Sequence, residues 1–202
     1  MKASGLGPSS AKAIAVTKDY LSSFAKVLAD FSAPKTQDEV LAQIPQLLSA
    51  EFDATRSELW LWDDTSGSGY LTHVAGVSAA HRRDYITPGM GVVGKVAQDK
   101  LIEVNFSLAS LGSEGQDFTA QSKLTHASVY PLTVNGRLLA LIANYSVDAA
   151  PNGLLQWWRM YSEIAEVAIG RAMSNEASQK TIQQLSLLFE ATRLLNSTLD
   201  LA

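Results

Sequence analysis

Hydrophobic residues recur at helical spacing close to the start of the chain. Between Val16 and Phe31, apolar residues fall on one side of a helix, while lysines and an aspartate fall on the other. Pro34 ends this stretch, because proline breaks a helix at or near its own position. The pattern predicts a first amphipathic helix. Residues 1–10, which are small and polar and contain Gly and Pro, are predicted to be a disordered tail.

A second helical stretch follows at once. Thr36 with Glu39 three residues later is the pattern of a capping box, in which each side chain bonds to the backbone of the other residue at a helix start. Apolar residues then continue at helical spacing as far as Phe52. Pro45 lies within this stretch, so we expect the second helix to be kinked.

The pattern changes to strand-like sequence in two pairs of segments. Residues 56–62 and 70–77 form the first pair, separated by a link rich in Asp, Ser and Gly. Residues 127–134 and 137–147 form the second pair, joined by Asn135-Gly136, the dipeptide most typical of a two-residue hairpin turn. Two hairpins predict an antiparallel sheet.

Between the two hairpins, a short helix is followed by a long polar stretch. The glycines of Gly89-Met-Gly-Val-Val-Gly94 match a dinucleotide-binding pattern, but the buried strand that such a site requires does not precede them. We interpret Gly89 and Gly91 as turn residues and Gly94 as a position of close helix packing. A short strand is predicted at residues 101–104. Residues 105–123 are longer than an ordinary connection and are a candidate binding loop or lid.

The C-terminal part of the chain is helical in pattern. From Leu154 to Met173 the helix is hydrophobic on nearly every side, so we expect the sheet to cover one side and a partner another. Beyond a polar stretch, apolar residues alternate at spacings of three and four, which is typical of a coiled-coil seam. The seam consists of Leu185, Leu188, Thr192, Leu195 and Leu199. It predicts a parallel homodimer, and because no stop signal follows it, we expect the helix to continue in a longer parent chain.

The order of these elements indicates an α+β fold. We expect a central antiparallel sheet with the terminal helices packed on one face and the small helices and lid loop on the other. A ligand pocket is expected beneath such a lid.

Composition narrows the possible functions. With 202 residues, 47% of them hydrophobic, the chain can form one substantial core. The net charge is −4 and the basic residues are scattered, so nucleic-acid binding is not expected. The absence of cysteine excludes disulfides, thiolate metal sites and thiol nucleophiles. Apolar runs fall far short of the ~20 residues that span a membrane, so we expect a cytoplasmic protein without direct membrane insertion.

Polar residues on the second hairpin are candidates for a ligand pocket. If the strand alternates, His126, Ser128 and Tyr130 share one face, beside Asn144 on the next strand. Such a polar column indicates either a lined pocket or an exposed sheet face.

Aromatic residues are further candidates. Trp60 and Trp62 share a face on which they could stack against a planar ligand, although core packing is the commoner role of such residues. Tyr85 and Phe118 lie in the predicted lid region. The histidines lack metal-ligand spacing, and no nucleophile or acid-base pair stands out, so we expect neither a metal site nor catalytic residues.

At this point the sequence resembles the GAF domains, sensory modules found in tandem in many signalling proteins. The matching pieces are TQDEVLAQI, SELWLWDDTSGSGYLTHVAGV, TPGMGVVGKVAQDKLIEV and ASVYPLTVNGRLLALIANYSV, within residues 20–175. The terminal LLFEATRLLNSTLDLA is similar to the opening helix of a following module, which would make this domain the first of a tandem. The resemblance divides the chain into the tail, a sensory domain at residues 11–175, and a signalling helix at residues 176–202.

The resemblance implies a ligand pocket under the lid and dimerisation through the terminal helices. It does not name the ligand. Cyclic-nucleotide-binding members share an N-K…F…D-E pattern, whereas here Asn105 is followed by Phe106, and Gln121-Ser122 stand where the acidic pair would be. Members that attach bilins through a cysteine of this domain, and the methionine-sulfoxide-reducing enzymes of this fold, need cysteines that this chain lacks.

We therefore expect a non-catalytic sensory module. A small molecule would bind beneath residues 85–125 and change the geometry of the terminal helices, and so the activity of a downstream effector domain. The expected ligand-binding residues are Trp60, Trp62, Tyr85, Phe118, His126, Ser128, Tyr130 and Asn144. Two alternatives remain open: a ligand-free module for dimerisation and signal relay, and a haem sensor with His73 or His126 as axial ligand.

Overall fold

The helices and strands that the sequence pattern predicts follow one another in the predicted order. The structure is a computed structural model that describes residues 8–33, 35–77, 84–112 and 122–199, with side chains described between residues 20 and 187 of those ranges. The helices are α1 (Pro8–Ser32), α2 (Gln37–Glu51), α3 (Gly91–Asp99) and α5 (Asn152–Leu199), with a 3-10 turn, η1, at Leu108–Leu111. The strands are β1 (Arg56–Asp63), β2 (Ser68–Gly76), β3 (Tyr85–Ile86), β4 (Glu103–Ser107), β5 (His126–Val134) and β6 (Arg137–Ser146).

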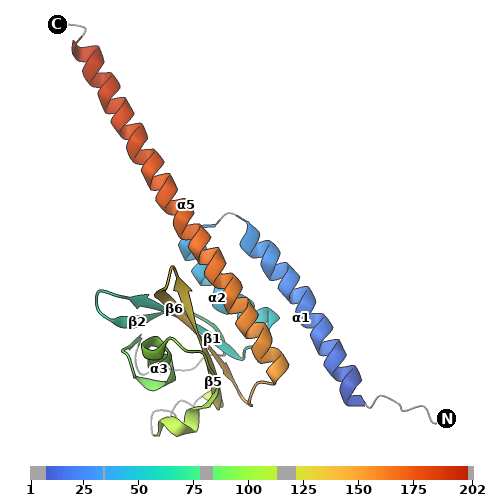
Figure 1. Cartoon of the computed structure of the whole chain (residues 1–202). Coiled ribbons are helices and arrows are strands. Elements are labelled where there is room, and N and C mark those ends of the chain that lie inside the picture. Colours follow the sequence, from blue (N-terminus) through green and yellow to red (C-terminus); the bar gives the residue numbers. More distant parts are fainter. Residues whose placement is uncertain (1–7, 34, 78–83, 113–121, 200–202) are drawn as a thin grey trace.

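The strands form one antiparallel sheet with the order β3-β2-β1-β6-β5-β4. Both predicted hairpins are present, and they meet at the centre of the sheet, where β1 pairs with β6. Helices α1, α2 and α5 lie on one face of the sheet and α3 lies on the other (Figure 1). This arrangement confirms the predicted α+β fold class. We call the two sides the helix face and the α3 face.

The turn between β5 and β6 shows how two residues of local sequence determine the pairing of two strands. Asn135 and Gly136 both have positive φ angles, 53° and 76°. A two-residue hairpin of this type needs positive φ at both positions, which Asn and Gly tolerate best. The predicted turn is confirmed, and it fixes the pairing of β5 with β6.

Helix starts are set by residues that suit a first turn. The predicted capping box of α2 is present, since the Thr36 side chain accepts from the Glu39 backbone N–H and the Glu39 carboxylate accepts from the Thr36 N–H. Helix α1 begins at Pro8, so residues 8–10, predicted to be part of a disordered tail, are helical. Proline fits the first turn of a helix, where its missing N–H would have no helical partner. Residues 1–7 lie outside the described part.

Two further boundaries differ from the prediction. Strand β4 begins two residues later than predicted and includes residues 105–107, which the sequence pattern assigns to the lid loop. Strand β3 pairs with β2 at the sheet edge and is not predicted at all, because two residues carry no periodic pattern. Residues 113–121 of the predicted lid are not among the described residues.

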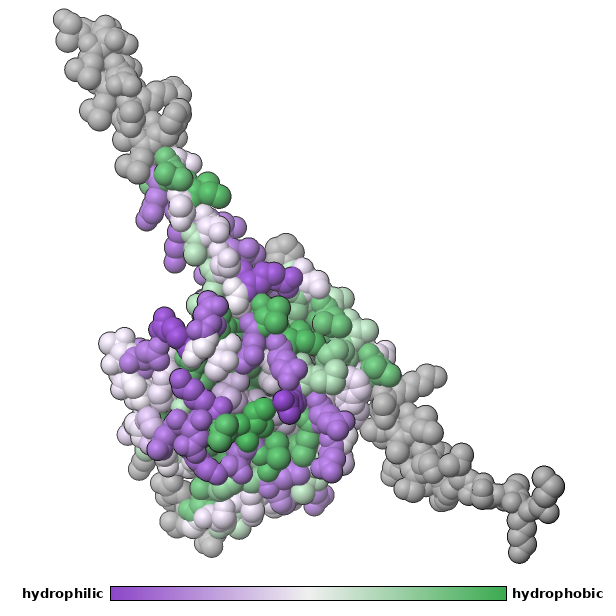
Figure 2. Space-filling model, viewed as in Figure 1, coloured by the Kyte–Doolittle hydropathy of each residue, from purple (hydrophilic) through white to green (hydrophobic). Residues whose placement is uncertain are grey.

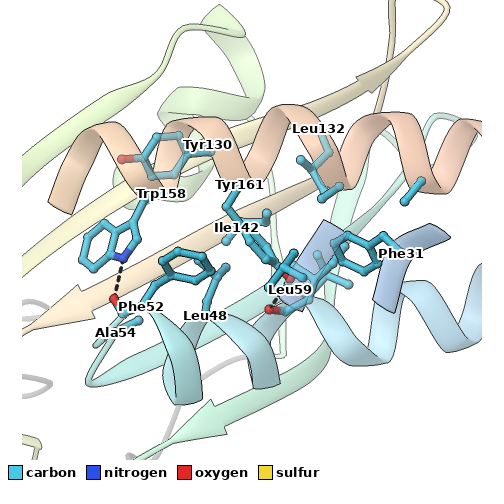
Figure 3. Packing of buried hydrophobic residues seen from close by; sticks show 14 of the residues in the cluster. Phe31, Leu48, Phe52, Ala54, Leu59, Tyr130, Leu132, Ile142, Trp158 and Tyr161 are labelled. Atoms are coloured by element: carbon cyan, nitrogen blue, oxygen red, sulfur yellow. Dashed lines mark hydrogen bonds between the residues drawn. The ribbon is translucent and has the colours of Figure 1, made fainter. Parts of the chain in front are cut away.

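Large aromatic side chains fill the core between the helix face and the helices. Trp158 and Tyr161 of α5 are buried against the end of α2, where the Trp158 indole N–H donates to the Phe52 carbonyl at 2.9 Å (Figure 3). The Tyr161 hydroxyl donates to the Ile44 carbonyl at 3.2 Å. Burial is the main reason that the pKa of Tyr161 is raised well above its usual value. These two bonds attach α5 to α2.

Close packing on the α3 face depends on one glycine. A Cβ atom at Gly94 would lie 2.3 Å from the Thr87 carbonyl oxygen, which is far inside contact distance. The predicted role of Gly94 is thus confirmed: it lets α3 approach the segment before it. The valines and alanine of α3, all buried, pack on Trp60, Val129 and Leu141 of the sheet.

Helix α5 is much longer than the sheet that it covers. It spans 48 residues without a break, including the position after residue 175 at which the sequence predicts a domain boundary. Its last described buried residue is Ala172, and residues 177–187 are exposed. Figure 1 shows this second half extending away from the sheet. Within the described ranges, no helix combines the length and apolar character needed to cross a membrane.

Candidate functional site

The structure divides the predicted ligand-binding residues between the two faces of the sheet. Trp60 is buried on the α3 face, and Trp62 packs beside it, half-buried. Ser128 and Asn144 are buried on the helix face, next to the core residue Tyr130. These residues therefore do not line a single pocket.

The remaining candidates lie away from the α3 face or outside the described residues. Tyr85 is 47% exposed at the sheet edge, where it pairs with Tyr70 and faces the same side as Leu61. His126 is half-buried at the start of β5, on the face of Ser128. The structure does not describe Phe118. Of the predicted residues that the structure describes, only the two tryptophans occupy the face that α3 covers.

A buried polar cluster accompanies Trp60 on the α3 face. Glu58, two residues before Trp60 on β1, has no solvent exposure. Its carboxylate accepts from Arg56 Nε at 2.5 Å, from the Trp60 indole N–H at 3.1 Å and from the Tyr145 hydroxyl at 3.0 Å. Arg56 also donates to the Val77 carbonyl at 2.8 Å. We call Arg56, Glu58, Trp60 and Tyr145 the Glu58 cluster.

Pairing of the central strands explains how the Glu58 cluster forms. Alternate residues of β1 point to the same face, which brings Arg56, Glu58 and Trp60 together. Arg56 pairs with Tyr145 across β1 and β6, so the phenol lies on that face as well. Burial, followed by the charge of Glu58, holds the pKa of Tyr145 well above its usual value, which keeps its hydroxyl a donor.

Sequence reasoning missed the charged half of this cluster. The signal that was available is a pair of opposite charges, Arg56 and Glu58, on alternate positions of a strand whose next four residues, 59–62, are apolar. Charged groups are seldom buried without a partner, so two such residues on one face of a central strand indicate a buried pair.

A second buried polar row crosses the helix face. Ser57, Asn144 and Ser128 are neighbours on β1, β6 and β5, and each is at most 2% exposed. The Ser57 hydroxyl and both amide atoms of Asn144 have no hydrogen-bond partner in the structure. The Ser128 hydroxyl accepts the backbone N–H of Asn105 at 3.0 Å. Part of the predicted polar column is therefore a row within the core.

Asn105 connects β4 to the start of α5. Its side-chain amide donates to the Ala150 carbonyl at 2.9 Å, and its side-chain oxygen accepts the Ala150 N–H at 2.8 Å. Asn105 itself has a φ of 50°, within a bulge of β4, a conformation that Asn tolerates better than most residues. Ala150 lies two residues before α5 begins at Asn152. Through Asn105, the strand that leads into the predicted lid is bonded to the base of the long helix.

The two histidines proposed as haem ligands do not face α3. His73 pairs with Leu59 across β2 and β1 and shares its face, which α2 and α5 cover, and His126 also lies on the helix face. The Nδ1 atom of His73 contacts the hydroxyl of Thr72, and that of His126 contacts the hydroxyl of Thr125. Neither ring is directed beneath α3 toward the predicted lid region, so the arrangement does not favour haem there.

Among the described residues, no group of three or more His, Asp or Glu side chains could hold a metal ion. The Glu58 cluster brings a carboxylate, a guanidinium, an indole and a phenol into one buried network.

Comparison with known proteins identifies the fold. No protein-family model matches the sequence, and no curated protein matches it. Among solved structures, the GAF domain of a phosphoenolpyruvate-protein phosphotransferase from Coxiella burnetii has a TM-score of 0.65 at 14% identity, covering 80% of this chain and 98% of that one. The chain has the GAF fold.

Other similar solved structures include a second phosphotransferase GAF domain and an enzyme. The GAF domain of the corresponding Acinetobacter phosphotransferase aligns with a TM-score of 0.60 at 10% identity over 76% of this chain and 94% of that one. The free methionine-R-sulfoxide reductase of Neisseria meningitidis, solved in complex with its substrate, aligns with a TM-score of 0.64 at 18% identity over 87% of this chain and 96% of that one. The likeness therefore gives the fold and leaves the activity to be argued from the site.

Proposed function

We propose that this GAF-fold protein is a non-catalytic regulatory domain that senses a small molecule on its α3 face and relays the bound state through α5. The observation that carries the proposal is the pair of hydrogen bonds between Asn105 and Ala150, because they join β4 to the base of α5. A change at β4 is thereby transmitted to the helix without crossing a flexible linker.

The absence of cysteine favours binding over reduction. A reductase that uses thiol chemistry needs a cysteine, and this chain has none. The enzymes that share the fold are therefore poor guides to its activity. A sensor needs only a recognition site and a mechanical connection to its output, and this proposal assigns these roles to the Glu58 cluster and to the Asn105–Ala150 pair.

The recognition site is proposed to be the Glu58 cluster with Trp62. The indole of Trp60 supplies a flat surface, and the Glu58 carboxylate and Arg56 guanidinium supply fixed charges. A ligand that enters beneath α3 displaces part of the side-chain packing there and shifts β4 and η1, which border the same apolar cluster through Phe106 and Leu108. The helix-face residues of the predicted set support the sheet in this proposal and do not contact the ligand.

The output is proposed to pass through a homodimer. The signalling helix at residues 176–202 pairs with its copy through the leucine seam. Leu185 is the one seam residue whose side chain the structure describes. The other seam residues lie in the described helix without described side chains: Leu188, Thr192, Leu195 and Leu199. Leu185 is 60% exposed, so its side chain is accessible to a second helix. An effector domain in a longer, cytoplasmic signalling chain, with this domain as the first of a tandem, would receive the change.

Ligand sensing is tested by thermal-shift screening of small metabolites against the wild-type protein and Trp60→Phe. The expected result is a compound that raises the unfolding temperature of the wild type by several degrees and that of Trp60→Phe by much less, since binding to the native state stabilises it. Leu21→Ala, an exposed change on α1 and so on the opposite face of the sheet from the cluster, serves as the control and is expected to respond like the wild type. A stabiliser with equal effect on all three proteins would contradict binding at this cluster.

The relay is tested at Asn105. Asn105→Gly removes both hydrogen bonds to Ala150 while keeping the positive φ, and Asn105→Asp keeps only the acceptor for the Ala150 N–H. We expect amide hydrogen exchange at residues 150–155 to rise at least tenfold in Asn105→Gly and less in Asn105→Asp. The ligand-induced change at α5 should weaken in the same order. Unchanged exchange in both variants would contradict a role for this pair in the relay.

A ligand-free relay module is the second candidate. It is favoured by the packing of the α3 face, where Trp60 is 3% exposed and Leu141 is fully buried, so that side chains occupy the space beneath α3. If no metabolite stabilises the protein while sedimentation still shows a dimer, this second function replaces the first.

A further inference from the structure

The buried polar row on the helix face is incomplete as a hydrogen-bonded network. Ser57, Asn144 and Ser128 lie side by side on β1, β6 and β5, and each is at most 2% exposed. Neither amide atom of the Asn144 side chain has a hydrogen-bond partner among the described residues. Buried polar atoms are nearly always bonded to protein or to ordered water, so this amide indicates a bound molecule that the row encloses.

The polar row is separate from the apolar surface of the molecule. Figure 2 shows hydrophobic residues gathered on the outer surface where α1 and α5 lie side by side. Asn144 instead shares the helix face with the core residue Ile142, and it is 1% exposed. A molecule bound to Asn144 must be small and polar, and water meets both conditions.

Ser128 provides a second partner for such a water. Its hydroxyl accepts the Asn105 N–H at 3.0 Å, and a serine hydroxyl also has one proton to donate. Ser128 lies directly opposite Asn144 across β5 and β6. Side chains in such a pair have Cβ atoms about 4.5–5.5 Å apart, a separation that one water molecule can bridge.

The other side of Asn144 offers fewer polar groups. Ser57 lies between Asn144 and Ala75 of β2, and alanine has no polar side-chain atom. On the Ser128 side, by contrast, the row continues to Asn105, whose side-chain amide is bonded to Ala150. A water needs two to four polar partners, so the Ser128 side is the better place for it.

We propose that one water molecule is bound in the core between Asn144 and Ser128, and that it connects β6 to the Asn105–Ala150 pair at the base of α5. The connection runs from the Asn144 amide through the water to the Ser128 hydroxyl, and from there to the Asn105 backbone. A hydroxyl that donates to water is a stronger acceptor, because hydrogen bonds in a chain polarise one another. The water therefore strengthens the bond that holds the Asn105 N–H.

This water gives the proposed sensor a route through the sheet. Tyr145, the residue after Asn144 on β6, points to the α3 face, where its hydroxyl donates to Glu58 at 3.0 Å. Neighbouring residues of a strand point to opposite faces, so a shift of β6 at the Glu58 cluster also moves Asn144. The inference rests on the proposed function, in which the Glu58 cluster is the recognition site and the Asn105–Ala150 pair is the relay.

The bound water is tested by magnetic relaxation dispersion of the water oxygen signal, which counts long-lived internal waters, on the ligand-free full chain. Asn144→Leu replaces the amide by an apolar group of similar size and should hold about one internal water fewer than the wild type. Ser57→Ala is the matched control, because it changes the same row on the side away from the water, and it should keep the wild-type count. Circular dichroism checks that both variants fold.

A second measurement needs no variant. In the wild type, nuclear Overhauser effects between water and the side-chain amide protons of Asn144 are expected, because the water lies within hydrogen-bond distance of that amide. Their absence would overturn the water site.

Amide hydrogen exchange at residues 150–155 tests the connection to α5. Asn144→Leu should raise this exchange by about threefold, because the base of α5 opens more often when the bond to Asn105 is weakened. Exchange at residues 40–48 of α2 should stay at the wild-type rate, since replacing both partners of a buried bond by an apolar group can leave overall stability nearly unchanged. A rise of the same size in both segments would contradict a route through the water.

The outcomes separate this inference from the proposed function. A wild-type water count in Asn144→Leu, or an equal loss in Ser57→Ala, would overturn the water site and leave the Asn105–Ala150 relay intact. If the count falls as expected while Asn105→Gly leaves exchange at residues 150–155 unchanged, the water site stands and the proposed relay is overturned.

Discussion

At the scale of single residues, two buried serines on one row of the sheet are expected to respond in opposite ways to loss of the hydroxyl. Ser57→Ala removes a hydroxyl that has no partner in the structure, so the free energy of unfolding should stay the same or rise by up to about 1 kcal/mol. Ser128→Ala removes the hydroxyl that accepts the Asn105 N–H, and the free energy of unfolding should fall by about 1–3 kcal/mol.

Urea denaturation of the two variants and the wild type measures this difference. Both substitutions remove one oxygen from a site that is at most 2% exposed, so the cavity left behind is matched. Equal destabilisation by the two variants would mean that Ser57 is satisfied in solution by a partner that the structure does not hold.

The sequence predicts which candidate site residues share a face of a strand, but not which face of the sheet that is. Alternation along the strands correctly groups His126, Ser128 and Tyr130 on one face and Trp60 with Trp62 on another. It cannot say which face receives the long helices, because both faces of the central strands are apolar. The predicted ligand set consequently mixed residues from opposite sides of the sheet.

At the scale of elements, the sequence predicts correctly those helices and strands that have a strong local signal, and it misses those that have a weak one. The capping box, the Asn135-Gly136 turn and the long amphipathic stretches each act within a few residues of sequence, so the corresponding elements are present as predicted. Strand β3 and the start of β4 depend on pairing with distant strands. Such tertiary pairing leaves no periodic pattern in a segment of two to five residues.

The capping box of α2 gives a prediction at this scale. Thr36→Ala removes the acceptor for the Glu39 N–H, and the free energy of unfolding should fall by about 0.5–2 kcal/mol at pH 7. Thermal unfolding followed by circular dichroism measures the loss.

The loss is expected to depend on pH. Hydrogen bonds from the Thr36 backbone and side chain hold the pKa of Glu39 below its usual value. A carboxylate with a lowered folded-state pKa contributes stability that is present above its unfolded pKa of about 4.3 and is lost as the pH falls through the folded value. The difference between wild type and Thr36→Ala should therefore shrink between pH 5 and pH 3. The backbone N–H that bonds the Glu39 carboxylate remains in Thr36→Ala, so the change with pH reports the bond from the Thr36 hydroxyl to that carboxylate. A constant difference over that range would contradict the hydroxyl bond.

At the scale of the whole molecule, the second half of α5 is expected to be dispensable for the fold of the sensory domain. A chain that ends at residue 177 keeps Glu176, whose carboxylate accepts the Gln37 N–H at 2.7 Å at the start of α2. Its unfolding temperature, compared at protein concentrations where the full chain is monomeric, should stay within about 2 °C of the full chain, because residues 177–187 are exposed.

Glu176→Ala in the shortened chain is the matched variant. It leaves the first N–H of α2 without its partner and should lower the unfolding temperature by several degrees in calorimetry, in contrast to the truncation alone. If the truncation itself unfolds the domain, the boundary between the domain and its signalling helix lies further along α5.

Because α5 continues without a break, its projecting half moves as one rigid arm. No glycine or proline interrupts the helix between Ala172, its last described buried residue, and Leu199, so nothing in this length favours a bend. That arm is about 40 Å long at 1.5 Å per residue, and a tilt of about 5° at its base moves its tip by about 3.5 Å. In the proposed relay, a tilt at Ala172 that is too small to disturb the core therefore becomes, at the far end, a displacement as large as the width of an atom.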